Sequence, residues 1–415
     1  MFSARVHYAW VVLAIGTLVV FGAIGMARFG YSVILPPMQS DLGLNNTQAG
    51  VLATANMIGY LVLSAIGGAL ASRYGPRLVI VLGLLVTGVG MILTGVAQGF
   101  FSAAVWRALT GLGSGASNVA VMGMIIAWFT IRRRGFASGI LVTGASFGLI
   151  FVGPLVPRML SVYGNSGWRM CWIIFGVVTL LFAVIGAFLL KDRPSAVGLA
   201  PYGSNGDEPS LHVEKEAIQW GKIYRSAAVW HLGLVYIAFG FSYVIYMTFF
   251  IKHLVTTGGY TQKAAGDLFM IMGWCSLFCG VIWGIVSDVV GRKYALMMIY
   301  LMHAAAFSLF ALWPSPPGFI ISAVLYGASA WSIPAIMSAA CGDILGPRLA
   351  PAAFGFTTIF LGLGQAIGPS VAGALADASG SFSPAFLLAG GVALLGAIGS
   401  SRLRPASAVS GISSE

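Results

Sequence analysis

An arginine interrupts the first long apolar run of the chain, between Ala27 and Phe29. A charge inside an apolar span is energetically costly and usually faces a cavity or a partner. A guanidinium group donates two parallel hydrogen bonds to a carboxylate and stays charged at any working pH. We therefore predict that Arg28 anchors an anionic ligand, with Tyr31 beside it on the same helix face. The alternative is an arginine that snorkels or binds backbone carbonyls.

Further polar side chains inside apolar runs are candidates for the wall of such a site. Arg107 and Asn118 fall on one face of the fourth run, and Tyr243 and Tyr246 belong to an aromatic stripe in the seventh. Tyrosine hydroxyls need hydrogen-bond partners in an apolar medium, although each stripe is also consistent with plain helix packing. Together with Arg28, the predicted substrate-binding residues are Tyr31, Asn56, Asn118, Tyr243, Tyr246 and Tyr326.

Acidic residues are missing from the middle of the apolar runs. All eleven lie in loops or close to the ends of runs: Asp41, Asp192, Asp207, Glu208, Glu214, Glu216, Asp267, Asp288, Asp343, Asp377 and Glu415. Sites for cationic compounds usually need a buried carboxylate, so the pattern favours an anion site. The sequence has no metal-spaced histidine pair, phosphate-binding loop or nucleophile elbow. It therefore predicts no enzyme, no metal and no cofactor.

The elements that must position these side chains are membrane spans. The 415 residues are 58% hydrophobic and only 8% charged, which predicts an all-α protein in a lipid bilayer. Gly111–Gly115 lies inside the fourth run and predicts close helix contact. Twelve runs are long enough to cross a membrane: 8–37, 46–71, 77–97, 100–130, 135–159, 168–190, 226–251, 264–287, 294–313, 317–341, 351–376 and 383–402.

The loops define the organisation and the orientation of the chain. A polar segment at 191–225 separates a bundle at 1–190 from a bundle at 226–404, and we predict a flexible cytoplasmic linker with an amphipathic helix near 211–223. The tail at 405–415 is predicted to be disordered. Basic residues concentrate in one set of loops and ends, which predicts a protein of the bacterial inner membrane with both termini on the cytoplasmic side. These residues are Arg5, Arg73, Arg77, Arg132, Arg133, Arg134, Lys191, Arg193, Lys215, Lys222, Arg225, Arg292, Lys293, Arg348, Arg402 and Arg404. The net charge of +11 thus reflects orientation rather than nucleic-acid binding.

At the start of the second run, Asn45 and Gln48 have the spacing of a capping box.

Two pairs of landmarks recur at one offset, which indicates an internal duplication. The stretch 284–293 repeats 68–77 in degenerate form, with Ser72 where the later copy has Asp288, at an offset of 284 − 68 = 216. Gly153-Pro154 and Gly368-Pro369 repeat at 368 − 153 = 215. The same offset carries Arg28 to position 28 + 216 = 244 and so places Tyr243 opposite Arg28.

The stretch 284–293 is the feature by which the chain resembles the transporters of the major facilitator superfamily. The resemblance implies two pseudo-symmetric six-helix bundles around a central cavity, rocking in alternating access. It implies a structural or proton-linked role for Arg107. We further predict that Asp288 accepts hydrogen bonds at a neighbouring helix N-terminus and that Arg292 reaches an acid such as Asp343, and that these contacts latch the cytoplasmic side. The remaining residues expected to serve the conformational change are Gly284, Gly291, Gly153, Pro154, Gly368 and Pro369.

A second, partial resemblance is to the oxalate/formate and monocarboxylate branch, through His7–Val12 and Trp283–Asp288. That branch typically has an arginine three residues before the Trp-Gly pair, where this chain has Gly280, so Arg28 would bear the charge. The expected function is transport of a small organic anion, preferably a monocarboxylate, by a monomer acting as a proton symporter or an anion exchanger. One alternative is proton-coupled efflux of hydrophobic drugs, which would need Asp267 or the otherwise core-packed His303. The other is a membrane sensor that does not transport.

Overall fold

The computed structural model describes residues 7–204 and 220–403, and these residues are almost entirely helical. In this part of the chain, eleven helices are long and apolar enough to cross a membrane. There are twelve if the pair Gln262–Ser276 and Cys279–Val290, bent by 42°, forms one span. The predicted all-α membrane fold is confirmed.

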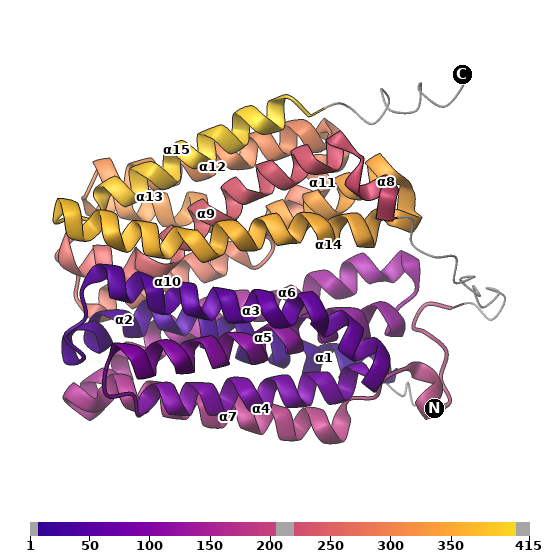
Figure 1. The fold of residues 1–415 in the computed structure, drawn as a ribbon, viewed down its shortest axis with the longest axis horizontal. Coiled ribbons are helices and arrows are strands. Elements are labelled where there is room, and N and C mark those ends of the chain that lie inside the picture. The colour runs from indigo at the N-terminus through magenta and orange to yellow at the C-terminus, as the bar shows by residue number, and fades with distance from the viewer. Residues whose placement is uncertain (1–6, 205–219, 404–415) are drawn as a thin grey trace, which may run out of the picture. The chain divides into compact units, whose positions relative to one another are not determined.

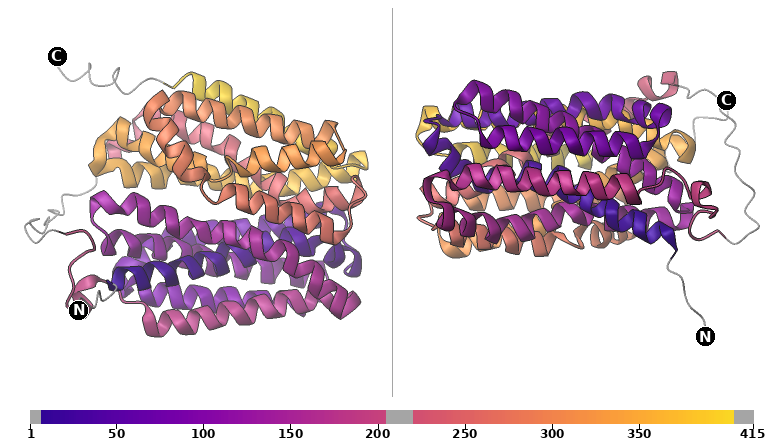
Figure 2. Two further views of the ribbon diagram at one scale, coloured as in Figure 1. Left: turned by 180° about the vertical axis from the view of Figure 1, so that it is seen from behind. Right: turned by 90° about the horizontal axis from the view of Figure 1, so that it is seen from below.

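The chain forms two compact units. One consists of Met1–Gly43 and Ala55–Glu214, the other of Leu44–Thr54 and Lys215–Glu415. The division falls inside a single helix, α3 (Asn46–Tyr74), whose first turns belong to the second unit. Within each unit the long helices lie roughly parallel to one another (Figures 1 and 2).

The first unit is built from six spans. Helix α4 packs between α5 and α7, and α6 packs against the first span. The helices are α1 (Tyr8–Val20), α2 (Gly30–Asp41), the larger part of α3, α4 (Pro76–Gly95), α5 (Phe100–Trp128), α6 (Ile131–Tyr163) and α7 (Gly167–Leu189).

The first span is not a uniform α-helix. Between α1 and α2 lies a π-helical segment, η1 (Phe21–Phe29), in which the Gly30 N–H bonds the Gly25 carbonyl. A Cβ on Gly25 would lie 2.7 Å from the Gly148 Cα, so α6 touches this segment backbone to backbone. π-Helical turns are rare and occur frequently at functional sites. The segment contains Arg28.

The second unit contains the remaining spans. Helix α9 packs against α14 and α15, and α12 packs against α13 and α15. Helix α14 contains the second part of the predicted span 317–341 and the whole of the span 351–376. Gly346 interrupts it between them with φ 78°, a conformation that favours glycine. The helices are α8 (Trp220–Tyr224), α9 (Ala227–Thr256), α10 (Gln262–Ser276), α11 (Cys279–Val290), α12 (Arg292–Leu312), α13 (Pro316–Gly327), α14 (Ser332–Ser379) and α15 (Ser383–Ser401).

The backbone repeats in the two units where the sequence does. Gly75 and Gly291 have φ 88° and 92° and each precedes a helix. In the first copy, where Ser72 stands in place of the acid, the Asp192 carboxylate accepts the Arg77 N–H at 2.8 Å. That carboxylate satisfies one of the free N–H groups at the start of α4.

The first part of the predicted linker is folded. The Tyr202 N–H donates to the Trp128 carbonyl at 2.9 Å, and the Thr130 N–H donates to the Tyr202 carbonyl at 3.1 Å. The Tyr202 ring contacts the rings of His7 and Trp10. Residues 191–204 therefore differ from the flexible linker that the polar composition predicted, because aromatic contacts hold them. The predicted amphipathic helix lies mostly, and the predicted tail wholly, outside the described residues.

Candidate functional site

Arg28, Tyr60 and Asn118 come together in the first unit. The Arg28 guanidinium lies 4.5 Å above the Tyr60 ring, and Asn118 Nδ2 donates to the Tyr60 hydroxyl at 2.9 Å. All three side chains are half-buried. Because the Tyr60 oxygen accepts from Asn118, its own hydrogen can be donated to a ligand. The group thus offers one cation and one neutral donor.

Arg107 lies next to this group and is 1% exposed. Its Nη1 donates to the Ala27 carbonyl at 2.7 Å, in the π-helical segment directly before Arg28. Its guanidinium lies 4.7 Å from the centre of the Tyr31 ring and 4.9 Å from that of Trp172. Each desolvated cation–π contact contributes about 2 kcal/mol, against a burial penalty of several kcal/mol for the ion. The rings and the carbonyl therefore offset part of the penalty without neutralising the charge.

Glycines bring the helices of this site into backbone contact. A Cβ on Gly111 would lie 2.0 Å from the Asn56 carbonyl oxygen, and one on Gly115 would lie 2.2 Å from the Tyr60 carbonyl oxygen. Small residues permit such close approach in membranes. The contact between α3 and α5 fixes Tyr60 against Asn118, and the prediction of packing for Gly111–Gly115 is confirmed.

Two predicted site residues serve packing contacts in this unit. Asn56 is 1% exposed, and its Nδ2 donates to the Arg107 carbonyl at 3.0 Å. Tyr31 is 2% exposed and lies against Arg107. Their role as ligand contacts stays a prediction.

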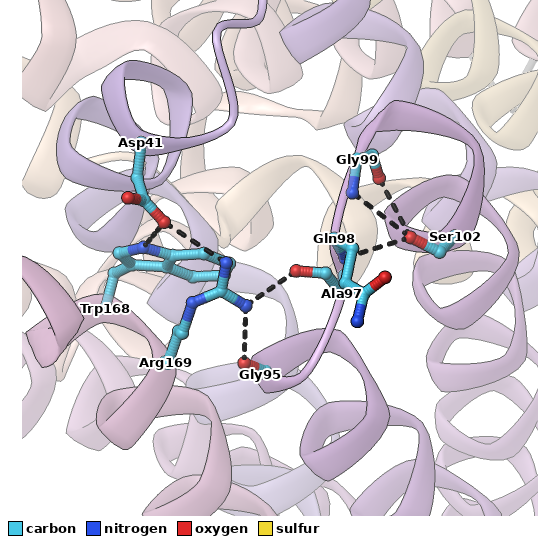
Figure 3. A network of polar contacts seen from close by, with 8 residues as sticks. All are labelled: Asp41, Gly95, Ala97, Gln98, Gly99, Ser102, Trp168 and Arg169. Carbon is cyan, nitrogen blue, oxygen red and sulfur yellow. Dashed lines mark hydrogen bonds and ion pairs between the residues drawn. The ribbon is translucent and has the colours of Figure 1, made fainter.

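At one end of the first unit, one oxygen of a carboxylate binds two neighbouring side chains (Figure 3). Asp41 Oδ2 accepts from Trp168 Nε1 at 2.9 Å and from Arg169 Nη2 at 3.2 Å. Arg169 also donates to the carbonyls of Gly95 and Ala97, at 3.2 and 2.6 Å. This network joins the ends of three helices and leaves Asp41 occupied.

In the second unit, the predicted tyrosines lie in an aromatic core. Gln365 Nε2 donates to the Tyr243 hydroxyl at 2.7 Å, and the Tyr246 hydroxyl shares a hydrogen bond of 2.7 Å with Ser322. Tyr246 is 0% exposed and contacts the rings of Phe250, Phe307, Phe310, Tyr326 and Phe386. These contacts satisfy Tyr246 within the protein.

His303 lies against the rings of Phe239 and Tyr326, at 5.8 and 5.2 Å between centroids. Neither ring nitrogen makes a hydrogen bond of ordinary geometry with a described residue, but the Ser329 backbone interacts electrostatically with the ring. The prediction of a core-packed histidine is confirmed, because the ring is fully buried among aromatic side chains.

The predicted latch residues of the second unit are in contact. Arg292 Nε lies 3.2 Å from Asp343 Oδ2, and Arg292 Nη1 donates to the Asp288 carboxylate and, at 2.6 Å, to Ser287. Gly291 provides the positive-φ turn between Asp288 and Arg292. Gly368 packs against α9, where a Cβ would lie 2.8 Å from the Phe241 carbonyl oxygen, while Pro154 lies inside α6. Whether these groups control the conformational change stays a prediction.

A second carboxylate contact of this unit was not anticipated. Asp377 accepts from the N–H groups of Asn46 and Thr47, at 3.0 and 2.7 Å, and from the Thr47 hydroxyl at 2.6 Å. It therefore caps α3 from a position 330 residues away in sequence. A carboxylate at a helix N-terminus is favourable because it satisfies free N–H groups beside the positive end of the dipole.

Solved structures identify this arrangement of helices. The chain superimposes on a D-xylose-proton symporter with a TM-score of 0.75 at 16% identity, covering 96% of this chain and 99% of the other. This likeness, together with the apolar helices, defines the class. The protein is a multi-pass membrane protein with the fold of the major facilitator superfamily transporters.

The family follows from the sequence. Residues 20–400 match the family described as "Uncharacterised MFS-type transporter YbfB", and the chain belongs to it. The protein is therefore a transporter and not an enzyme. The chain is 26% identical to the "Probable sulfoacetate transporter SauU" of Cupriavidus necator, covering 91% of this chain and 90% of that protein. It is 25% identical to the "Hexuronate transporter" of Bacillus subtilis, covering 89% of both.

Proposed function

We propose that the protein transports a small organic anion across the bacterial inner membrane by alternating access, with both termini in the cytoplasm. Arg28 binds the carboxylate of the substrate. The proposal is carried by one observation: a half-buried guanidinium in a membrane span, in a π-helical turn and above the Tyr60 ring. The named relatives support it, since sulfoacetate and hexuronate are organic anions.

The geometry suits an acid group better than a neutral or cationic compound. The guanidinium has a fork of donors that matches two oxygens, and the Tyr60 ring contacts its face. The Tyr60 hydroxyl can donate a third hydrogen bond. A monocarboxylate is the smallest ligand that satisfies this group. The protein works as a monomer, and coupling is by proton symport or by anion exchange.

The test is counterflow in liposomes that contain the purified protein. Sulfoacetate, lactate and glucuronate serve as anions, and xylose and tetraphenylphosphonium as neutral and cationic controls. Arg28→Gln should abolish anion uptake, whereas Arg28→Lys should keep part of it because the charge remains. Arg158→Gln, at an exposed arginine of α6 in the same unit, is the matched control. Uptake of xylose or the cation, with no uptake of any anion, would refute the proposal.

The coupling mode is decided in the same liposomes. An imposed proton gradient should drive accumulation of the anion if the protein is a symporter. If only internal anion stimulates uptake, the protein is an exchanger. Binding of anions without flux in either assay would instead support the sensor hypothesis.

A further inference from the structure

Arg107 contacts the π-helical segment η1 from a neighbouring helix. Its Nη1 donates to the Ala27 carbonyl at 2.7 Å, one residue before Arg28. In η1 the Gly30 N–H bonds the carbonyl five residues back, whereas an α-helix bonds the carbonyl four residues back. Where the chain returns from the first pattern to the second, one carbonyl loses its partner in the helix and needs a donor from elsewhere. Arg107 supplies a donor in this stretch.

A pair of glycines brings the same segment against α6. A Cβ on Gly25 would lie 2.7 Å from the Gly148 Cα, and one on Gly148 would lie 2.2 Å from the Gly25 Cα. This contact fixes how closely the two backbones approach, but it contains no hydrogen bond. Arg107 adds a polar contact two residues further along η1, at Ala27.

The backbone of Arg107 is bonded to the helix that carries Tyr60. Asn56 Nδ2 donates to the Arg107 carbonyl at 3.0 Å. Asn56 lies one helical turn before Tyr60 on α3. Arg107 is therefore connected to the turn of Arg28 through its side chain and to the helix of Tyr60 through its carbonyl. The Arg28 guanidinium and the Tyr60 ring, 4.5 Å apart, are the two groups that these connections align.

The surroundings of Arg107 do not suit a proton-linked role. An arginine keeps its proton in proteins, so such a role needs a protonatable partner, usually a carboxylate. In residues 7–43 and 55–204 the only acidic side chains are Asp41 and Asp192, and both accept hydrogen bonds elsewhere. Within the described part of the chain, the Arg107 side chain contacts a backbone carbonyl and two aromatic rings instead.

We propose that Arg107 is a positioning residue. It fixes the π-helical turn so that the Arg28 guanidinium and the Tyr60 hydroxyl bind one acid group together. The inference rests on the proposed function and deepens it, since it names the residue that aligns the two donors. Arg107 itself is 1% exposed, covered by its two rings and the Ala27 carbonyl. Its effect on the ligand therefore passes through Arg28.

The test is a double-mutant cycle between Arg107 and Tyr60. Tyr60→Phe removes the hydroxyl and keeps the ring against Arg28. Arg107→Met removes every donor of the side chain and keeps an unbranched apolar chain in the buried position. Affinities for sulfoacetate, lactate and glucuronate are measured by calorimetry on the detergent-purified full-length chain, for the wild type, both single variants and the double variant.

For at least one of the three anions, we expect Tyr60→Phe to weaken binding by about tenfold or more, which corresponds to one lost hydrogen bond to a charged group. Arg107→Met alone should weaken binding by a similar factor. In the Arg107→Met background, Tyr60→Phe should weaken binding by less than about threefold, because Arg28 and the hydroxyl no longer reach one acid group together.

Arg169→Met is the matched control in the same unit. Arg169 also donates to backbone carbonyls and lies over an aromatic ring, but at the end of the unit beside Asp41. In its cycle with Tyr60→Phe the two effects should multiply, because a loss of stability alone does not couple to a ligand contact.

A second variant keeps the test decisive if Arg107→Met does not fold or binds too weakly to titrate. Asn56→Ala removes the hydrogen bond between α3 and the Arg107 carbonyl and takes the place of Arg107→Met in the cycle. It should likewise reduce the effect of Tyr60→Phe to less than about threefold. An Asn56 that binds the ligand directly would leave that effect at its full size.

Three results would overturn the inference. One is an effect of Tyr60→Phe that is as large in the Arg107→Met background, or in its Asn56→Ala replacement, as in the wild type. Another is an Arg107→Met variant that binds like the wild type. The third is a Tyr60→Phe variant that binds like the wild type, since Arg107 would then have no second donor to align. All three leave anion binding intact, whereas a wild type that binds none of the three anions would refute the proposed function itself.

Discussion

The backbone contact at Gly115 gives the sharpest prediction for the site. Gly115→Ala places a methyl group 2.2 Å from the Tyr60 carbonyl oxygen, whereas ordinary contact begins near 3.4 Å. Helices α3 and α5 must then separate by about 1.2 Å (3.4 − 2.2) because the obstacle is backbone and cannot rotate away. Tyr60 is the residue that must move, so the effect reaches Arg28 directly.

Gly123→Ala is the matched control on the same helix, since nothing lies within 4 Å of its added methyl group. Both substitutions gain about 0.5–1 kcal/mol of helix stability, and this term cancels between them. Overpacking costs about 1–3 kcal/mol at Gly115 alone. For a unit of this size the melting temperatures should therefore differ by roughly 2–12 °C.

The measurement is thermal unfolding of both variants in detergent, followed by anion titration. Displacement of Tyr60 should weaken anion binding by roughly 10–140-fold in Gly115→Ala, the equivalent of one lost hydrogen bond to a charged group. Gly123→Ala should bind like the wild type. Equal melting temperatures for the two variants would refute the packing argument. A stability loss with unchanged affinity would show that Tyr60 does not serve the site.

Four further predictions concern the second unit. Tyr246→Phe removes the hydroxyl bonded to Ser322 and should lower the melting temperature by about 2–4 °C without changing anion affinity; an affinity loss alone would instead place Tyr246 in the site. His303→Phe should raise stability by about 1 kcal/mol in a denaturation assay, and a decrease would show that the imidazole has a polar partner. Asp377→Ala should destabilise the protein by about 1–2 kcal/mol through loss of the α3 cap, and unchanged unfolding would contradict that role. Asp288→Asn should slow counterflow more than it weakens binding; a pure affinity loss would count against a latch.

Local rules predicted the parts of the fold that depend on neighbours in sequence. Asn45 and Gln48 form the expected capping box, with hydrogen bonds of 3.0 and 2.7 Å. The capping residues lie three positions apart, so their spacing alone specifies the contact. The cap from Asp377 has no such signal, because 330 residues separate the carboxylate from Thr47 and only tertiary packing brings them together.

The site was predictable in its chemistry and not in its geometry. Arg28 and Arg107 are conspicuous because charges are rare in membrane spans. Tyr60 and Gln365 were not in the predicted set, since a tyrosine or a glutamine in a helix is common and only contact distances reveal its partner. The π-helical turn could not be predicted from the sequence either, because glycines permit such a turn without requiring it.

The π-helical segment has a consequence for the length of the first span. In an ordinary α-helix, deleting one residue rotates everything on one side of the deletion by about 100° and turns core-facing side chains toward lipid. Between Phe21 and Phe29 the chain is wound with more residues per turn, so a one-residue deletion there can be absorbed by tightening the turn. This segment is thus the place in the span where a one-residue deletion is tolerated best. The same tightening would rotate Arg28 relative to α1. A one-residue deletion in this segment would therefore change the direction in which Arg28 meets a ligand.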